Sequence, residues 1–137
     1  MIKRNEVTQW FGPIVNVSAD LSDNRGRILV ECADYLWYFK NRYTAKLRQF
    51  EQEEQGDIAW TLINESQNST NGTLLITEGS SITSVDRDRT YERGRIQELL
   101  ENFGNLQNGF DFTFDATKDA GGLLNGVVFN RYQPLRS

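Results

Sequence analysis

Paired aspartates are the first candidates for catalysis, because the chain contains no histidine to act as a general acid or base. Asp111 and Asp115 fall on one face of an expected strand, where a rise of about 3.4 Å per residue places them about 13 Å apart. Glycosidases hold their two carboxyl groups about 5–9.5 Å apart, so this pair is too widely spaced. Asp86 and Asp88 lie among arginines, which favours ion-paired surface carboxylates. The sequence therefore predicts no catalytic residue and a protein that is not an enzyme.

Metal and cofactor sites are poorly supported by the residue types. Asp115, Thr117 and Asp119 have the spacing of the first ligands of a calcium loop. However, Ala120 replaces the glycine at its sixth position, and Gly126 stands where its bidentate glutamate belongs. The absence of histidine and the single cysteine exclude histidine-containing zinc sites and thiolate clusters. We expect no metal and no cofactor.

Aromatic and basic residues are interleaved between positions 35 and 48, a pattern that can form a stacking platform for single-stranded nucleic acid. A sequence pI near 4.9 argues against a phosphate-binding face. Acidic residues also follow this segment directly. We expect an aromatic helix packed on a sheet, with its basic side chains directed to solvent, and no binding to nucleic acid.

Aromatic residues near the N-terminus indicate a binding surface. Trp10 and Phe11 precede a Gly-Pro step and are expected to be incompletely covered by the rest of the chain. Because aromatic residues are enriched at the centres of protein interfaces, Trp10, Phe11 and Trp37 are candidate interface residues. Burial in the chain's own core explains Trp10 and Phe11 equally well. Alternatively, Trp10, Trp37 or Trp60 stacks on a sugar or another ligand, which would make the chain a carbohydrate- or ligand-binding module.

The candidate interface residues flank an expected β-hairpin. Residues 14–18 alternate imperfectly, as in a strand with one buried face, and residues 27–33 return after a turn at 22–26. Pro13 is expected at the start of the first strand or on an edge, because it cannot donate to a ladder. Cys32 falls on the apolar side of the returning strand and is expected to be a small buried residue.

Helical patterns follow the hairpin. Asp34 fits an N-cap for a helix over residues 35–43, whose apolar residues have helical spacing. Asp57 is expected to cap a second helix. A third helix is predicted over residues 96–103, where apolar residues recur at i, i+3, i+4 and i+7, with Gly104 as its C-cap.

Strands and loops complete the expected fold. Residues 44–54 are ambiguous and could extend or restart the first helix, residues 73–77 form a short strand, and residues 78–93 form a loop with some extended structure. Residues 110–115 alternate strictly between aromatic and polar side chains, and residues 123–132 return as the partner strand. The expected order is β-β-α-α-β-α-β-β, an α+β fold of antiparallel β-hairpins packed with about three helices.

Length and composition indicate a single folded domain over residues 1–137. Hydrophobic residues make up 38% of the chain and charged residues 25%, with a net charge of −4, which excludes a disordered chain. No apolar run approaches the roughly 18 residues that span a bilayer, so we expect no membrane partner.

Four stretches together resemble the minor tail proteins of long-tailed bacteriophages (siphoviruses), in particular the tail-hub type. The stretches are Trp-Phe-Gly-Pro-Ile-Val at 10–15, Val-Glu-Cys-Ala-Asp-Tyr-Leu at 30–36 with Arg42, Asp-Ile-Ala-Trp-Thr-Leu-Ile at 57–63, and a C-terminal block of residues 87–91, 96–103, 109–112 and 131–134. Their order and spacing cover nearly the whole chain. Family members are usually longer, with sequence on both sides, so we expect a segment of a longer protein or a shorter relative.

The resemblance implies a structural virion component of a phage tail, without a cofactor. Such a protein is made in the host cytoplasm and assembles around the tail axis as a cyclic homo-oligomer, with a trimer favoured. Its other partners would be the tail tube, tape-measure and tip proteins. A ligand-binding module and, third, a hydrolase using Asp86 or Asp111 are the competing hypotheses.

Overall fold

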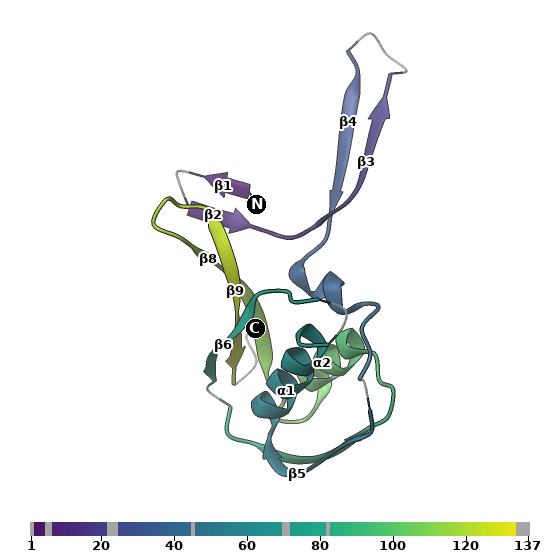
Figure 1. Cartoon of the computed structure of the whole chain (residues 1–137), viewed down its shortest axis with the longest axis vertical. Coiled ribbons are helices and arrows are strands. Elements are labelled where there is room, and N and C mark those ends of the chain that lie inside the picture. Colours follow the sequence, from purple (N-terminus) through teal and green to yellow (C-terminus); the bar gives the residue numbers. More distant parts are fainter. Residues whose placement is uncertain are drawn as a thin grey trace. The chain divides into compact units, whose positions relative to one another are not determined.

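The computed structural model describes residues 2–4, 7–21, 25–44, 46–69, 72–81 and 83–133, with the backbone alone for 2–4 and 7–10. The chain divides into two compact units, Met1–Tyr38 and Phe39–Ser137, and Figure 1 labels most of their elements. Each unit has its own sheets, which share no strand.

The first unit consists of two antiparallel strand pairs and a short helical turn. Strand β1 (Ile2–Arg4) pairs with β2 (Val7–Trp10), and β3 (Ile14–Asp20) pairs with β4 (Arg27–Cys32). The β3–β4 pair confirms the predicted hairpin. Pro13 directly precedes β3, as predicted, and its carbonyl accepts a hydrogen bond of 3.1 Å from the Ala33 N–H, which extends the ladder by one step.

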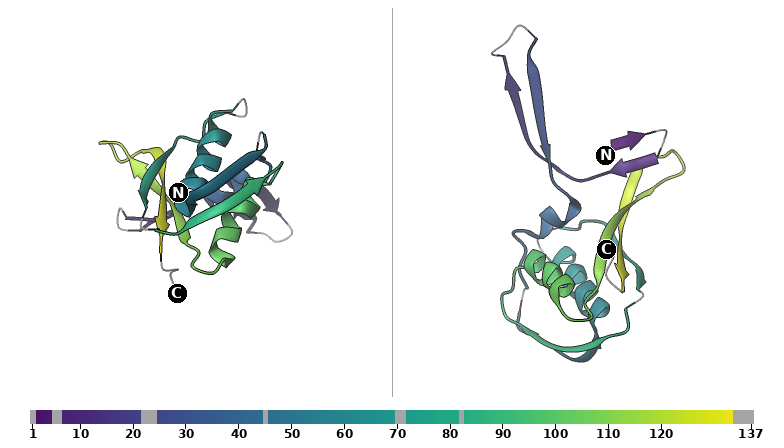
Figure 2. Two further views of the ribbon diagram at one scale, coloured as in Figure 1. Left: turned by 90° about the horizontal axis from the view of Figure 1, so that it is seen from below. Right: turned by 180° about the vertical axis from the view of Figure 1, so that it is seen from behind.

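The second unit holds two α-helices and two sheets among its described residues. Its elements are β5 (Arg48–Glu54), α1 (Gln55–Gln67), β6 (Ile76–Ser81), β7 (Asp86–Tyr91), α2 (Ile96–Asn105), β8 (Asp111–Lys118) and β9 (Leu124–Tyr132). One sheet has the order β6-β9-β8, with β6 parallel and β8 antiparallel to β9. The other pairs β5 with β7, and this pair runs below the two helices in the right view of Figure 2.

The core of the second unit forms where the aromatic side of β8–β9 meets the helices. The register places Phe114 opposite Phe129, with ring centroids 5.3 Å apart. Among the described residues, the buried hydrophobic side chains are Phe39, Phe50, Ile58, Ala59, Leu62, Ile63, Ile76, Ile96, Leu100, Phe103, Phe110, Val127 and Phe129. The strict alternation of residues 110–115 therefore does separate an aromatic side from a polar side, as predicted.

A buried arginine joins the start of α1 to the three-stranded sheet. Arg131 is 1% exposed, and its guanidinium donates to the Gly56 carbonyl at 2.7 Å and to the Glu78 carboxylate at 2.9 Å. Gly56 permits this approach, because a Cβ there would lie 3.0 Å from the Arg131 Cδ. The N-cap of α1 is Glu54, so the prediction that Asp57 caps this helix is wrong.

The α+β class is confirmed, but the predicted three helices and their order are not. Within residues 35–43, only the 3₁₀ helix η1 (Tyr35–Phe39) forms, and in it the Tyr35 and Tyr38 rings, three residues apart, make an edge-to-face contact. In the ambiguous segment 44–54, residues 48–54 form β5 rather than helix, with Leu47 exposed before the strand and Phe50 buried within it. Gly104 lies inside α2, which ends at Asn105.

The remaining differences come from strands that the sequence pattern does not reveal. The segment over residues 78–93, expected to be a loop with some extended structure, contains the end of β6 and all of β7. The short strand expected at 73–77 begins only at Ile76, and it pairs in parallel with β9 rather than in a hairpin. No helix in the described part of the chain is long and apolar enough to cross a membrane.

Candidate interaction surface

The register of the β3–β4 hairpin separates its side chains into two chemically different faces. Residues directly opposite each other in an antiparallel pair share a face, and so do residues two apart along a strand. Val17 lies opposite Val30, and Ala19 lies opposite Ile28. A β-bulge at Val15 shifts the register next to the last pair, Ile14 and Cys32. One face of the hairpin, called here the apolar face, therefore consists of Ile14, Val17, Ala19, Ile28, Val30 and Cys32.

The opposite face of the hairpin is polar. Its cross-strand pairs are Asn16 with Glu31, Ser18 with Leu29, and Asp20 with Arg27. The Asn16 amide donates to the Glu31 carboxylate at 3.0 Å. Leu29 is the single apolar residue among these three cross-strand pairs, so the hairpin is amphipathic.

The apolar face is uncovered. Every residue of β3 and β4 is exposed, and Ile14, Val17 and Ile28 retain 64%, 59% and 75% of their accessible surface. The predictions of a buried face here and of a buried Cys32 are therefore wrong. Seven of the thirteen exposed large hydrophobic residues in the described part of the chain lie between positions 14 and 30. Contiguous exposed apolar surface of this kind marks interaction sites.

An aromatic cluster holds the base of the hairpin. Phe11 lies three residues before β3 and Tyr35 three residues after β4, and their ring centroids are 5.6 Å apart. Tyr38 contacts both Tyr35 at 4.9 Å and Trp37 at 5.8 Å between centroids. The candidate interface residues Phe11 and Trp37 thus belong to one cluster, in which Phe11 is half-buried and Trp37 is 40% exposed. The Trp10 side chain lies outside the described residues.

The aspartates considered for catalysis and metal binding act as structural hydrogen-bond acceptors. Asp115 accepts from the Asn130 amide at 2.6 Å and from the Thr113 hydroxyl at 2.8 Å. Asp111 accepts from the Phe112 N–H at 2.9 Å. Asp119 accepts from two backbone N–H groups, each at 2.9 Å, and closes the β8–β9 turn. The described residues contain no group of three potential metal ligands.

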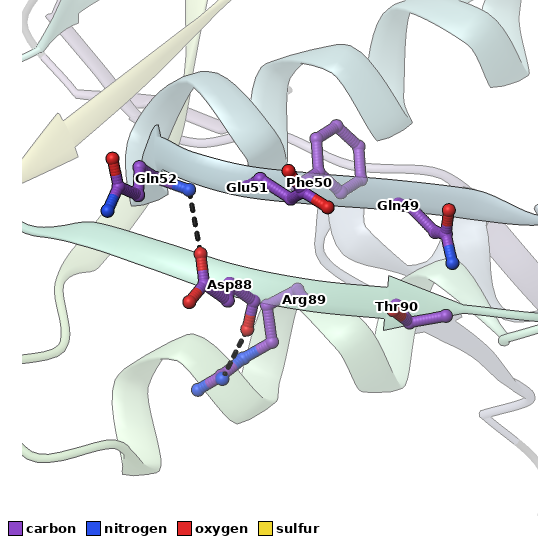
Figure 3. Close-up of a pocket in the computed structure, with 7 residues that line it drawn as sticks. All are labelled: Gln49, Phe50, Glu51, Gln52, Asp88, Arg89 and Thr90. Atoms are coloured by element: carbon purple, nitrogen blue, oxygen red, sulfur yellow. Dashed lines mark hydrogen bonds between the residues drawn. The ribbon is translucent and has the colours of Figure 1, made fainter.

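Asp88 supports a bulge between β5 and β7. Figure 3 shows the hollow of about 660 Å³ beside this bulge, lined by Gln49, Phe50, Glu51, Gln52, Asp88, Arg89 and Thr90. The Gln52 N–H donates to the Asp88 carboxylate at 2.7 Å, and the Arg89 guanidinium donates to the Asp88 carbonyl at 2.9 Å. Both bonds hold backbone in place. The hollow is lined mostly by polar atoms, and the Glu51 and Asp88 carboxyl groups are among its lining residues.

The basic residues of the interleaved segment partly serve the second unit itself. Arg42 donates to the Ser66 carbonyl in the last turn of α1 at 2.9 Å, where a cation is favoured by the helix dipole. Arg48 of β5 forms an ion pair with Glu65, which is also in α1. The segment does not form a helix with a basic edge. Arg42 and Arg48 instead bind side chains and backbone of α1.

Comparisons with known proteins give no match: no family model matches the chain, and no curated protein or solved structure matches it significantly.

Proposed function

We propose that this chain is a structural component of a phage tail, a minor tail protein of the hub type that acts through subunit association at the tail tip. The observation that carries the proposal is the exposed apolar face of the β3–β4 hairpin. An isolated two-stranded hairpin is marginally stable in water. A hairpin with one apolar side therefore gains most of its stability from whatever covers that side.

The size of the apolar face sets the strength of association that it supports. Covering a Val or Ile side chain completely is worth about 1.5–3 kcal/mol, and four such side chains are available. Association costs on the order of 4–15 kcal/mol in lost translational and rotational freedom. The two magnitudes are comparable, so one contact through this face gives weak, reversible association. Closure into a ring, in which each subunit makes two contacts, makes the assembly more stable.

The resemblance of the four sequence stretches supports the phage-tail part of the proposal. It favours a cyclic homo-oligomer, most often a trimer, that joins tail tube, tape-measure and tip proteins in the virion. The structural use of Asp88, Asp111, Asp115 and Asp119 supports a role in assembly rather than catalysis.

Sedimentation velocity and electron microscopy test the proposal together. The sedimentation coefficient should rise with protein concentration and reach a plateau, because a closed ring has a fixed number of subunits. Gold-labelled antibodies against the chain should bind the tail tips of the phage that encodes it. A monomer at all concentrations, or labelling absent from intact particles, contradicts the proposal. Binding on a glycan array without self-association would instead favour the ligand-binding module.

A further inference from the structure

We propose that the apolar face of the β3–β4 hairpin packs against the same face of other copies of this chain, so that the hairpins meet on the symmetry axis of the oligomer. This inference rests on the proposed function, because it names the surface through which the subunits associate. The occupant of the face is a second copy of the chain, not a ligand.

Charge complementarity favours the same face as the partner. The six residues of the apolar face carry no charged group, so a partner surface must also be free of charge to cover them without burying an unpaired ion. The charges of the hairpin lie on the polar face, where Asp20 and Arg27 are directly opposite each other. Two apolar faces can therefore meet while every charged group of both hairpins stays in water.

The second unit offers no comparable surface among its described residues. Its exposed large hydrophobic side chains are Tyr43, Leu47, Leu75, Leu123 and Leu124, which come from three separate segments. The Arg95 guanidinium lies over the Tyr43 ring, 5.8 Å from the ring centroid, so a charged group lies next to this side chain. The apolar face instead carries four exposed Val and Ile side chains on two paired strands, which makes it the surface that one copy is proposed to present to another.

The geometry of paired strands permits this contact. Two β-layers stack about 10 Å apart, with the side chains of their inner faces interdigitated. Small and large residues lie side by side on the apolar face, where Ala19 is opposite Ile28. Identical faces that meet on an axis satisfy two-fold symmetry, and three such faces around one axis satisfy three-fold symmetry.

The hairpin contains a matched pair of positions that tests the inference. Ile28 and Leu29 are neighbours on β4, and both are large, aliphatic and mostly exposed, at 75% and 59%. They lie on opposite faces, because successive residues of a strand alternate. Ile28→Lys places a charge in the proposed contact, whereas Leu29→Lys adds the same charge to the polar face.

Sedimentation velocity should separate the two variants. Ile28→Lys should weaken self-association at least about 100-fold, because an unpaired ammonium would be buried between the faces. Leu29→Lys should change it by less than about threefold. Val17→Lys and Ser18→Lys repeat the contrast on β3. Unchanged far-UV circular dichroism will show that the variants keep their secondary structure, as expected for exposed positions.

Cys32 supplies an independent readout, because the only cysteine of the chain lies on the apolar face. Its rate of alkylation by iodoacetamide should fall as the concentration of the native protein or of Leu29→Lys rises. In Ile28→Lys the rate should stay at the fast value of the monomer. These measurements follow the contact itself rather than the mass of the assembly.

The outcomes separate the inference from the proposed function. If the native chain associates but Ile28→Lys and Leu29→Lys behave alike, the subunits use another surface, so the inference fails while the proposed function stands. If the chain stays monomeric and Cys32 is protected at every concentration, its own residues cover the face, and both fail. Selective loss of association in Ile28→Lys and Val17→Lys, with exposure of Cys32, supports the inference.

Discussion

Glu54 links the end of β5 to the start of α1. Its carboxylate accepts hydrogen bonds from the Gly56 N–H at 2.9 Å and the Asp57 N–H at 3.1 Å, which satisfies two of the four free N–H groups at this end of the helix. Burial raises the pKa of the Glu54 carboxyl above its ordinary value, although these hydrogen bonds and the Arg131 guanidinium act in the opposite direction. The residue therefore caps the helix at an electrostatic cost.

The raised pKa of Glu54 predicts that the free energy of unfolding depends on pH. A carboxyl with a raised pKa binds its proton more tightly in the folded state, so the stability from that proton is present at acid pH and is lost as the pH rises through the folded-state pKa. The free energy of unfolding of the native chain minus that of Glu54→Gln should therefore fall between acid and neutral pH. Urea titrations at a series of pH values measure this difference, with Glu53→Gln as the neighbouring control. A difference that rises with pH would contradict the cause assigned to the shift.

At the scale of elements, the strands β5 and β7 depend on a strained bulge. Gln52 has φ of 49°, a left-handed conformation that costs a non-glycine residue about 1–2 kcal/mol. Gln52→Gly should therefore stabilise the chain by about 0.5–1 kcal/mol, because the backbone bond to Asp88 is kept and the strain is removed. Gln49→Gly on the same strand, without that strain, should destabilise it by a similar amount. Thermal unfolding compares them, and equal shifts in both variants would show that the bulge is not strained.

Whether an element can be predicted from the sequence depends on which contacts stabilise it. Helix α2 and strands β8 and β9 bury side chains with a regular period, so their sequences show the pattern directly. Strands β5 and β7 are held to each other by backbone pairing, and Arg87 of β7 donates to the Gln55 side chain at the start of α1 at 2.7 Å. Residues distant in sequence provide these contacts, and no local pattern reveals them.

The sequence predicts the apolar face of the β3–β4 hairpin but not its exposure. Alternation along residues 14–18 and 27–33 correctly predicts a hairpin with an apolar side, but alternation is the same whether a neighbour in the chain or another molecule covers that side. The exposure of Ile28 and Cys32 is therefore a property that only the structure provides. The aromatic residues indicate the base of the hairpin, while its exposed aliphatic residues form the apolar face.

At the scale of the whole molecule, an assembly built on the apolar face should respond to solvent as a hydrophobic contact. The chain has a net charge of −4, so copies repel weakly, and screening this repulsion should strengthen association slightly. Sulfate should strengthen association further, and cooling should weaken it, because apolar burial contributes less at low temperature. Sedimentation equilibrium in sodium chloride, in sodium sulfate and at several temperatures measures these effects. Strong dissociation by sodium chloride would instead identify ion pairs as the main contact and exclude the apolar face from that role.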